Sequence, residues 1–136
     1  MSFLLDTNVI SETRRKRPDS QVMSWLRGVD PANMHVSVLT FGEIAKGISQ
    51  RARHDAAEAE VLRHWLETTR RLYSDRTVAI DTEISEAWGQ LAAKRTFPVI
   101  DGLLAATALV RGMTFVTRDT RDIAGTGVRT INPWNT

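Results

Sequence analysis

Acidic residues occupy comparable positions in four separate parts of the sequence, at the end of a predicted strand or the start of a predicted helix. These residues are Asp6, Glu43 in the first turn of a predicted helix, Asp101, and the pair Asp119 and Asp122. Carboxylate oxygens are hard ligands that select Mg²⁺ or Mn²⁺. Such an ion polarises a phosphodiester oxygen and lowers the pKa of a bound water toward about 7. The pattern therefore predicts metal-assisted hydrolysis that needs neither histidine nor cysteine.

The elements that must position these acids alternate between short β-type runs and segments with helical periodicity. The predicted strands span residues 3–5, 35–38, 78–80, 114–116 and 128–131. This alternation indicates an α/β fold with a parallel sheet. Right-handed crossovers place the end of every strand and the start of every following helix at one edge of the sheet, where open α/β sheets bind ligands. We therefore expect the acids to converge at that edge, where a cation would relieve their mutual repulsion.

The expected helices differ in how far they are buried. Residues 21–27, 55–73 and 82–95 each have one apolar face and are predicted to lie on the surface of the sheet. Residues 103–110 are apolar on nearly every side, so this helix, which is expected to begin at Asp101, should be buried. Three tryptophans on helical faces are assigned to the core: Trp25, Trp65 and Trp88.

The composition narrows the chemistry. A chain of 136 residues fits one domain over residues 1–136, with 42% hydrophobic and 25% charged residues. The absence of cysteine excludes disulfides, iron–sulfur clusters and thiolate zinc sites. The closest pair of its 3 histidines, His54 and His64, matches no zinc motif. A net charge of +2 says little about partners.

The termini and apolar runs predict a cytoplasmic protein. Residues 1–6 lack a basic leader, and Asp6 interrupts their apolar run. The longest apolar stretch, residues 102–110, is much shorter than the roughly 20 residues that span a bilayer. We therefore expect no membrane association.

The acids also have purely structural alternatives, because caps and turns use the same residue types. The alternatives are a turn or N-cap for Asp6, a capping box from Thr40 to Glu43, a helix cap for Asp101 and an Asx turn for Asp119. Asp81 follows the third predicted strand by the same rule, and it is most simply the cap of the helix 82–95. Only the convergence of several segments distinguishes a site from a set of caps.

Four motifs follow one another along the whole chain: Leu4-Leu5-Asp6-Thr7-Asn8, Gly42-Glu43-Ile44, Asp101 before the small residues 104–108, and Val116-Thr117-Arg118-Asp119. Together with the ending at residues 128–134, they resemble PIN-domain ribonucleases, and most closely the VapC or FitB-like toxins of bacterial toxin–antitoxin modules. The resemblance implies a three-layer α/β/α sandwich whose parallel sheet of about five strands has the order 3-2-1-4-5. In that order Asp81 lies about two strand spacings, or roughly 10 Å, from the first strand.

The resemblance also implies roles for single residues. Asp6 and Asp101 match the central metal ligands of the family, and Glu43 matches the third acid. The fourth is Asp119 or Asp122, and the choice stays open because many relatives have asparagine where Asp119 stands. The polar positions beside the ligands are matched by Thr7, Asn8 and Thr117. The implied reaction is hydrolysis of RNA phosphodiesters by water, with one or two Mg²⁺ or Mn²⁺ ions, leaving a 5′-phosphate.

Positive charge is expected around the acids, because RNA must approach them. The candidates are Arg14, Arg15, Lys16, Arg17, Arg118 and Arg121, and the alternative for the run 14–17 is a solvated loop. No aromatic-rich RNA-binding signature accompanies these residues, so base stacking is not predicted.

The resemblance further implies a substrate such as transfer or ribosomal RNA and a VapB- or FitA-like antitoxin. That antitoxin wraps the helices and places a basic side chain near the acids. Homodimers and toxin–antitoxin hetero-oligomers are implied, with DNA contacted by the antitoxin and not by this chain.

Two other classes of protein compete with a nuclease. A receiver domain needs a late lysine, but Lys94 is the last one, and an aspartyl phosphatase needs an acid where Asn8 stands. Outside the enzymes, the alternative is a catalytically inert PIN-like module that acts through a protein partner. The presence of all the motif acids argues against it.

Overall fold

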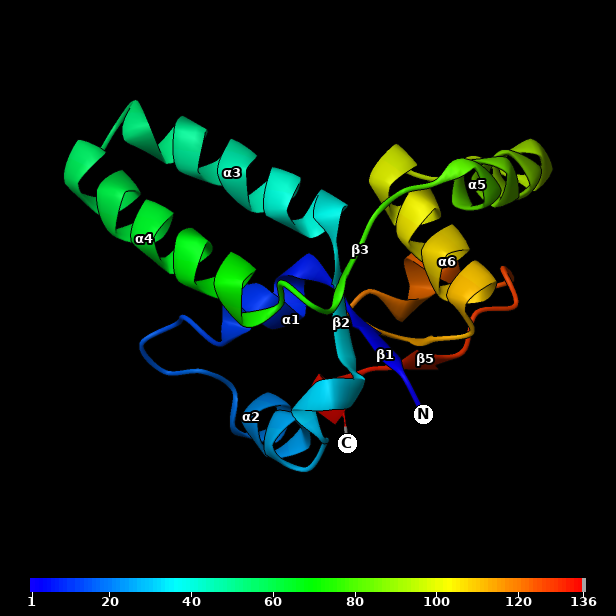
Figure 1. The fold of residues 1–136 in the computed structure, drawn as a ribbon, viewed down its shortest axis with the longest axis horizontal. Coiled ribbons are helices and arrows are strands. Elements are labelled where there is room, and N and C mark those ends of the chain that lie inside the picture. The colour runs from blue at the N-terminus through cyan, green and yellow to red at the C-terminus, as the bar shows by residue number, and fades with distance from the viewer. Residues whose placement is uncertain (136) are drawn as a thin grey trace.

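The computed structural model describes residues 1–135 and is built on one parallel sheet with the strand order β3-β2-β1-β4-β5 (Figure 1). The strands are β1 (Phe3–Leu5), β2 (Met34–Ser37), β3 (Thr77–Val78), β4 (Thr114–Val116) and β5 (Thr130–Ile131). The predicted order and the parallel direction of the strands are confirmed. This order puts β1 and β4 side by side at the centre of the sheet.

The bounds of three strands differ from those predicted. β2 ends at Ser37 because the Ser37 side chain accepts a hydrogen bond from the backbone N–H of Leu39 and caps the next helix. β3 ends at Val78, two residues before the predicted end. β5 begins at Thr130, two residues after the predicted start; before it, Gly127 adopts a φ of 86° and Val128 donates its N–H to the Thr126 hydroxyl.

Six α-helices and three short 3₁₀ helices are present in the described residues. They are α1 (Thr7–Glu12), α2 (Ser20–Arg27), η1 (Pro31–Asn33), α3 (Val38–Ala52), α4 (Ala56–Leu72), α5 (Thr82–Lys94), α6 (Val99–Arg111), η2 (Thr120–Ile123) and η3 (Pro133–Asn135). Helices α3 and α4 pack together as one long hairpin, and α5 and α6 form a second hairpin on the other side of the sheet (Figure 1). None of the helices in residues 1–135 combines the length and apolarity needed to cross a membrane.

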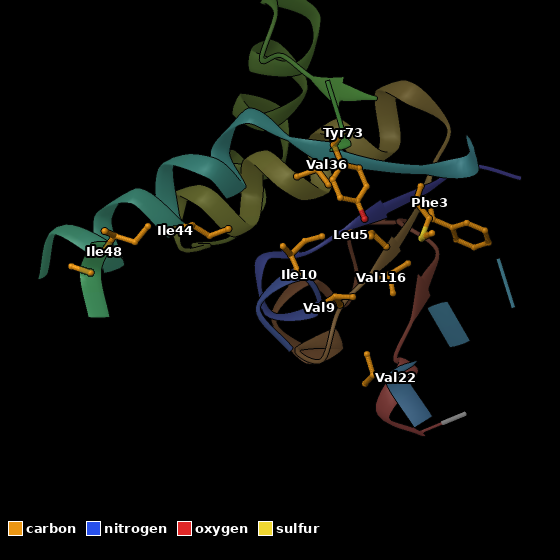
Figure 2. Packing of buried hydrophobic residues seen from close by; sticks show 12 residues of the cluster. Phe3, Leu5, Val9, Ile10, Val22, Val36, Ile44, Ile48, Tyr73 and Val116 are labelled. Atoms are coloured by element: carbon orange, nitrogen blue, oxygen red, sulfur yellow. The ribbon is translucent and has the colours of Figure 1, made fainter. Parts of the chain in front are cut away.

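The hydrophobic core has two parts because side chains alternate across the strands. Phe3 and Leu5 contribute to the cluster on the side of α1 to α4, which Figure 2 shows, whereas Leu4 belongs to the cluster beneath α5 and α6. The three tryptophans assigned to the core pack against these clusters but are only partly buried: Trp25, Trp65 and Trp88. The sheet therefore has helices packed on both faces, as the α/β/α prediction required.

The apolar helix α6 is buried along most of its length, as expected, but it begins earlier than predicted. Pro98 is its N-cap and makes no side-chain capping bond, so Asp101 lies within the first turn instead of capping it. The next residue, Gly102, lies against the indole of Trp88 on α5, where an added Cβ would be 2.9 Å from the ring. Because Gly102 has no side chain, the first turn of α6 can approach the Trp88 ring of α5 this closely.

Asp81 has the structural role assigned to it. Its carboxylate accepts the N–H of Ile84 at 2.9 Å and caps α5, and it also pairs with Arg111. The third predicted strand therefore contributes a cap at this position, as expected.

Candidate metal-binding acidic edge

Asp6 lies at the carboxyl end of β1 and is bound directly to the end of β4. Its backbone N–H donates to the carbonyl of Val116 at 2.9 Å. Its Oδ1 accepts the N–H of Thr7 at 2.8 Å, and its Oδ2 accepts the hydroxyl of Thr117 at 2.7 Å. Asp6 is therefore the N-cap of α1, as the structural alternative held, but only one carboxylate oxygen is used in that way.

Glu43 is held by α1. The Thr7 hydroxyl donates to Oε1 of Glu43 at 2.5 Å and lies 3.1 Å from the hydroxyl of Thr40, which is fully buried. The expectation of Glu43 in the first turn was wrong, as was the capping-box alternative, because Ser37 caps α3 and Glu43 falls in the second turn. Sequence reasoning missed Thr40 as a site neighbour because its position suggested a capping role.

Asp119 joins the same network from the end of β4. Its N–H donates to the Thr117 hydroxyl oxygen at 3.0 Å, and its Oδ2 accepts the Asn8 side-chain amide at 3.1 Å. It is the N-cap of η2 but forms no side-chain capping bond, so it does not act as an Asx cap. The Asn8 Oδ1 is buried and has no hydrogen-bond partner among the described residues.

The four acidic segments act on one another electrostatically. Burial raises the pKa of Asp6 to about 6, and the charges of Glu43 and Asp101 add to this, while the hydrogen bonds from Thr117 and Thr7 oppose it. Burial also raises the pKa of Asp101, and the charges of three other acids contribute: Asp122, Glu43 and Asp119. The predicted convergence of Asp6, Glu43, Asp101, Asp119 and Asp122 at one edge is therefore present.

The acids are neighbours but not a closed set of ligands. Within residues 1–135, no group of three or more histidine, cysteine, aspartate or glutamate side chains is arranged to hold one metal ion. Two of the oxygens that face this edge are already engaged by hydroxyls, Asp6 Oδ2 by Thr117 and Glu43 Oε1 by Thr7. The edge is therefore an acidic surface on which the side chains of Asp6, Glu43 and Asp119 are held by hydrogen bonds.

Two grooves meet at Glu43. One, of about 500 Å³, extends from Thr7, Asn8 and Glu43 along α3 and α4 to Trp65, and Arg14, Arg15 and Arg51 also line it. The other, of about 410 Å³, lies between Glu43, Lys46 and Ile100. Both grooves therefore reach the acidic edge at Glu43.

The candidate RNA-binding residues differ in whether their side chains contact other parts of the protein. Arg14 lies over the Trp65 ring at 5.8 Å and 3.7 Å from Glu58, and Arg15 contacts Glu12 at 3.3 Å. Arg118 lies over the Trp134 ring at 5.0 Å. Lys16, Arg17 and Arg121 are exposed. Arg14 and Arg15 therefore form part of the wall of the larger groove, and the run 14–17 is not a uniformly solvated loop.

Glu12 is a second residue that sequence reasoning missed. Its carboxylate is buried, with only 4% of the residue exposed. The sequence feature that could have indicated this burial is the position of Glu12 at the end of a helix that contributes Val9 and Ile10 to the core.

Comparison with known proteins agrees with this geometry. The PIN domain model matches residues 3–126. The plasmid stability protein StbB of Pseudomonas syringae pv. tomato is 32% identical, with 97% of this chain and 98% of that protein covered. Toxin FitB of Neisseria gonorrhoeae is 30% identical (98% and 99% covered), and VapC ribonuclease Y4jK of Sinorhizobium fredii is 31% identical (97% of each).

Solved structures have the same fold over nearly the full length. FitAcB from Neisseria gonorrhoeae matches with a TM-score of 0.89 and 29% identity, covering 98% of this chain and 99% of that one. The structure of FitAB bound to an IR36 DNA fragment matches with a TM-score of 0.86 and 30% identity, covering 97% of this chain and 95% of that one. The matched strand order, the acidic edge and these relatives lead to one assignment. The chain belongs to the PIN domain family.

Proposed function

We propose that this protein is a metal-dependent endoribonuclease toxin of a toxin–antitoxin module. The observation that carries the proposal is the meeting of acids from distant segments at one edge, where Thr117 binds both Asp6 and Asp119, and Thr7 binds Glu43. Relatives named as a toxin and as a VapC ribonuclease over almost the whole chain support it. Caps alone do not require acids from four segments to adjoin one another.

The donor atoms at this edge are of the type that Mg²⁺ or Mn²⁺ prefers, although the acids within residues 1–135 would have to move closer together to hold one ion. All the candidate donors are oxygen atoms, the acids repel one another, and the orphaned Asn8 Oδ1 is a further buried acceptor at the same edge. Asp6 and Asp101 are the proposed central ligands, with Glu43 third. When bound, the ion supplies positive charge opposite the scissile phosphate and lowers the pKa of water.

The neighbouring polar residues orient the acids. Thr117 directs Oδ2 of Asp6 by a 2.7 Å hydrogen bond, and Thr7 directs Oε1 of Glu43 by one of 2.5 Å. Outer partners of this kind typically contribute 10- to 100-fold to metal affinity or activity. Fixing the carboxylates in advance reduces the reorganisation needed when substrate and ion bind.

Asp119 is the proposed fourth acid. It is held by Asn8 and by the Thr117 hydroxyl that also binds Asp6, whereas no described residue donates a hydrogen bond to the carboxylate of Asp122. Asp122 contributes its charge to the environment of Asp101. We therefore assign Asp122 an electrostatic effect on the site and assign direct ligation to Asp119.

An antitoxin is the proposed protein partner. Among similar proteins of known structure, FitAB has been solved bound to an IR36 DNA fragment. The larger groove suits an inhibitory segment, because apolar Ile44, Ile48, Leu62 and Trp65 lead to Glu43 at its inner end. We place the chain in the cytoplasm as a homodimer that contacts DNA only through its antitoxin.

The decisive experiment uses the purified full chain after removal of any antitoxin. We expect cleavage of a structured RNA, such as transfer RNA, with Mg²⁺ or Mn²⁺ to give 5′-phosphate ends, and we expect chelator to stop it. Asp6→Asn and Asp101→Asn should each abolish cleavage while the far-ultraviolet circular dichroism spectrum is retained. Undiminished cleavage in chelator or in either variant would refute the proposal. No cleavage together with stable antitoxin binding would favour the inert module.

The RNA target is best found by sequencing RNA ends after brief induction of the toxin in cells. Ends that accumulate with the native chain and are absent with Asp101→Asn identify the cleavage sites. Ends that are equally abundant with both would not arise from this edge.

A further inference from the structure

A buried carboxylate closes the loop that carries the basic run. Glu12, the last residue of α1, is 4% exposed, and its Oε2 accepts the backbone N–H of Asp19 at 2.8 Å. Its Oε1 faces Arg15 at 3.3 Å. An ionised carboxylate is strongly disfavoured inside a protein unless hydrogen bonds and an opposite charge compensate it. Both kinds of partner are present here, and both belong to the segment that follows α1.

The bond from Glu12 to Asp19 joins the end of α1 to the start of α2. The Asp19 carboxylate accepts the N–H groups of Gln21 and Val22 and thereby caps α2. Residues 13–18 therefore form a loop whose two ends are held together by Glu12. We call residues 13–18 the basic loop.

Within the basic loop the first two cations are already engaged. Backbone N–H groups of Arg14 and Arg15 donate to the carbonyls of Ser11 and Glu12, so the chain continues in tight turns after α1. The Arg14 side chain is directed to α4, where it contacts Glu58 and Trp65.

The next two cations of the basic loop, Lys16 and Arg17, have no such partners among the described residues. Lys16 and Arg17 are exposed, and neither takes part in any ion pair found within residues 1–135. Arg14 and Arg15 of the same loop line the groove that contains Glu43. The basic loop therefore contributes Arg14 and Arg15 to the larger groove, and it also carries two exposed cations that form no ion pair within the described residues.

We propose that Glu12 is a positioning residue that keeps the basic loop closed, so that Lys16 and Arg17 bind RNA phosphates beside the groove that leads to Glu43. The inference rests on the proposed function, because it takes RNA as the ligand. An acidic edge repels a polyanion, and nearby cations supply the attraction that is independent of sequence. In this proposal Arg14 and Arg15 line the groove, whereas Lys16 and Arg17 contact the RNA phosphates.

RNA binding is measured separately from cleavage to test this. All proteins carry Asp6→Asn, and the probe is a fluorescein-labelled RNA stem-loop titrated in Mg²⁺ at several salt concentrations. Lys16→Ala with Arg17→Ala should weaken binding and make the plot of log affinity against log salt shallower by about 0.7 to 0.9 for each cation lost. The matched control is Arg129→Ala, which removes an exposed cation just before β5, the outermost strand next to β4. This substitution should change neither the RNA affinity nor its salt dependence.

Glu12 is tested with two substitutions. Glu12→Gln keeps an acceptor for the Asp19 N–H and should bind RNA with nearly the native salt slope. Glu12→Ala removes the acceptor and should lose affinity and slope as the double variant does, with the loop cut faster by trypsin after Lys16. If Glu12→Ala melts below the assay temperature, Glu12→Asp replaces it, because its side chain is one methylene shorter and does not reach Asp19.

The possible outcomes separate the two proposals. An unchanged RNA affinity and salt slope in the double variant overturns the inference, whether or not the native chain cleaves RNA. Weaker binding of the antitoxin with unchanged RNA binding also overturns it and makes the loop a protein contact. Equal slopes in Glu12→Gln and Glu12→Ala overturn the positioning role. A loss of RNA affinity in a chain that never cleaves would leave the loop assignment standing and refute the nuclease.

Discussion

The Thr117 hydroxyl donates a hydrogen bond to Oδ2 of Asp6 at 2.7 Å and accepts the N–H of Asp119 at 3.0 Å. This one buried group therefore connects acids that follow two adjacent parallel strands. It also stabilises the charged form of Asp6, against burial and against the neighbouring carboxylates.

Replacing Thr117 with valine should raise the pKa of Asp6 further above about 6, since the hydrogen bond from Thr117 lowers it. A larger fraction of Asp6 is then protonated near neutral pH. We expect the acidic limb of the plot of kcat/KM against pH to move to higher pH, with activity at pH 7 falling about 10- to 100-fold. Thr117→Ser keeps the hydroxyl and should keep the native limb. A profile with equal limbs in both variants would contradict this account.

The Asp6 carboxylate should destabilise the metal-free protein above pH 6. Its pKa is about 6 when folded and 3.8 as the reference for the unfolded chain, so the folded state binds more protons between these values. The contribution of Asp6 to stability is therefore present below pH 4 and is lost as pH rises through 6.

In chelator, Asp6→Asn should consequently raise the Tm at pH 7.5 and have less effect at pH 4.5. Circular dichroism melts measure this difference. The matched control is Glu86→Gln on the exposed face of α5, which should give no such dependence on pH. A lower Tm for Asp6→Asn at pH 7.5 would show that its hydrogen bonds outweigh the strain of the charge.

Thr7→Val should release Glu43, because valine has the shape of threonine but cannot donate to Oε1. It also leaves the buried Thr40 hydroxyl without its 3.1 Å neighbour. We expect kcat to fall about 10- to 100-fold and the Mg²⁺ concentration for half-maximal rate to rise. Thr7→Ser should recover most of the rate. If valine and serine were equally active, Glu43 would not depend on this hydroxyl.

Asp119→Asn should reduce cleavage far more than Asp122→Asn, because only Asp119 is held in the network of Asn8 and Thr117. Removing the charge of Asp122 should lower the pKa of Asp101, whose pKa that charge raises. Single-turnover rates and the pH dependence of each variant distinguish a ligand from an electrostatic neighbour. The reverse order of rates would exchange the roles of the two residues.

Gly102→Ala should disturb the position of Asp101. An added Cβ would be 2.9 Å from the Trp88 ring, so α6 or the indole must move. Overpacking of this kind usually destabilises a protein by about 1–3 kcal/mol. Chemical denaturation measures the loss, and the matched control is Gly89→Ala on α5, where an added Cβ has open space. A cleavage rate equal to that of the native protein in Gly102→Ala would mean that the Trp88 indole had moved and that α6 had kept its position.

The convergence of the acids was predictable because it depends on topology. Parallel strands and right-handed crossovers put residues such as Asp6 and Asp119 at one edge regardless of side-chain detail. The local contacts were not predictable in the same way. Thr40 and Ser37 are both suitable caps by residue type, and only the end of β2 decides that Ser37 caps α3. The burial of Glu12 depends on Asp19, seven positions away, which no helical or strand periodicity relates to it.

The α3–α4 hairpin offers a place for labels. Its turn, residues 53–55, is exposed and lies at the end of the hairpin farthest from the sheet (Figure 1), while Glu43 lies near the other end. Asp55 caps α4, so the peptide bond between Arg53 and His54 is the place where extra residues would leave both helices intact. A fluorophore or affinity tag inserted there would lie beside the end of the larger groove that Arg51 lines, and would report the arrival of a partner at that end without touching the acids.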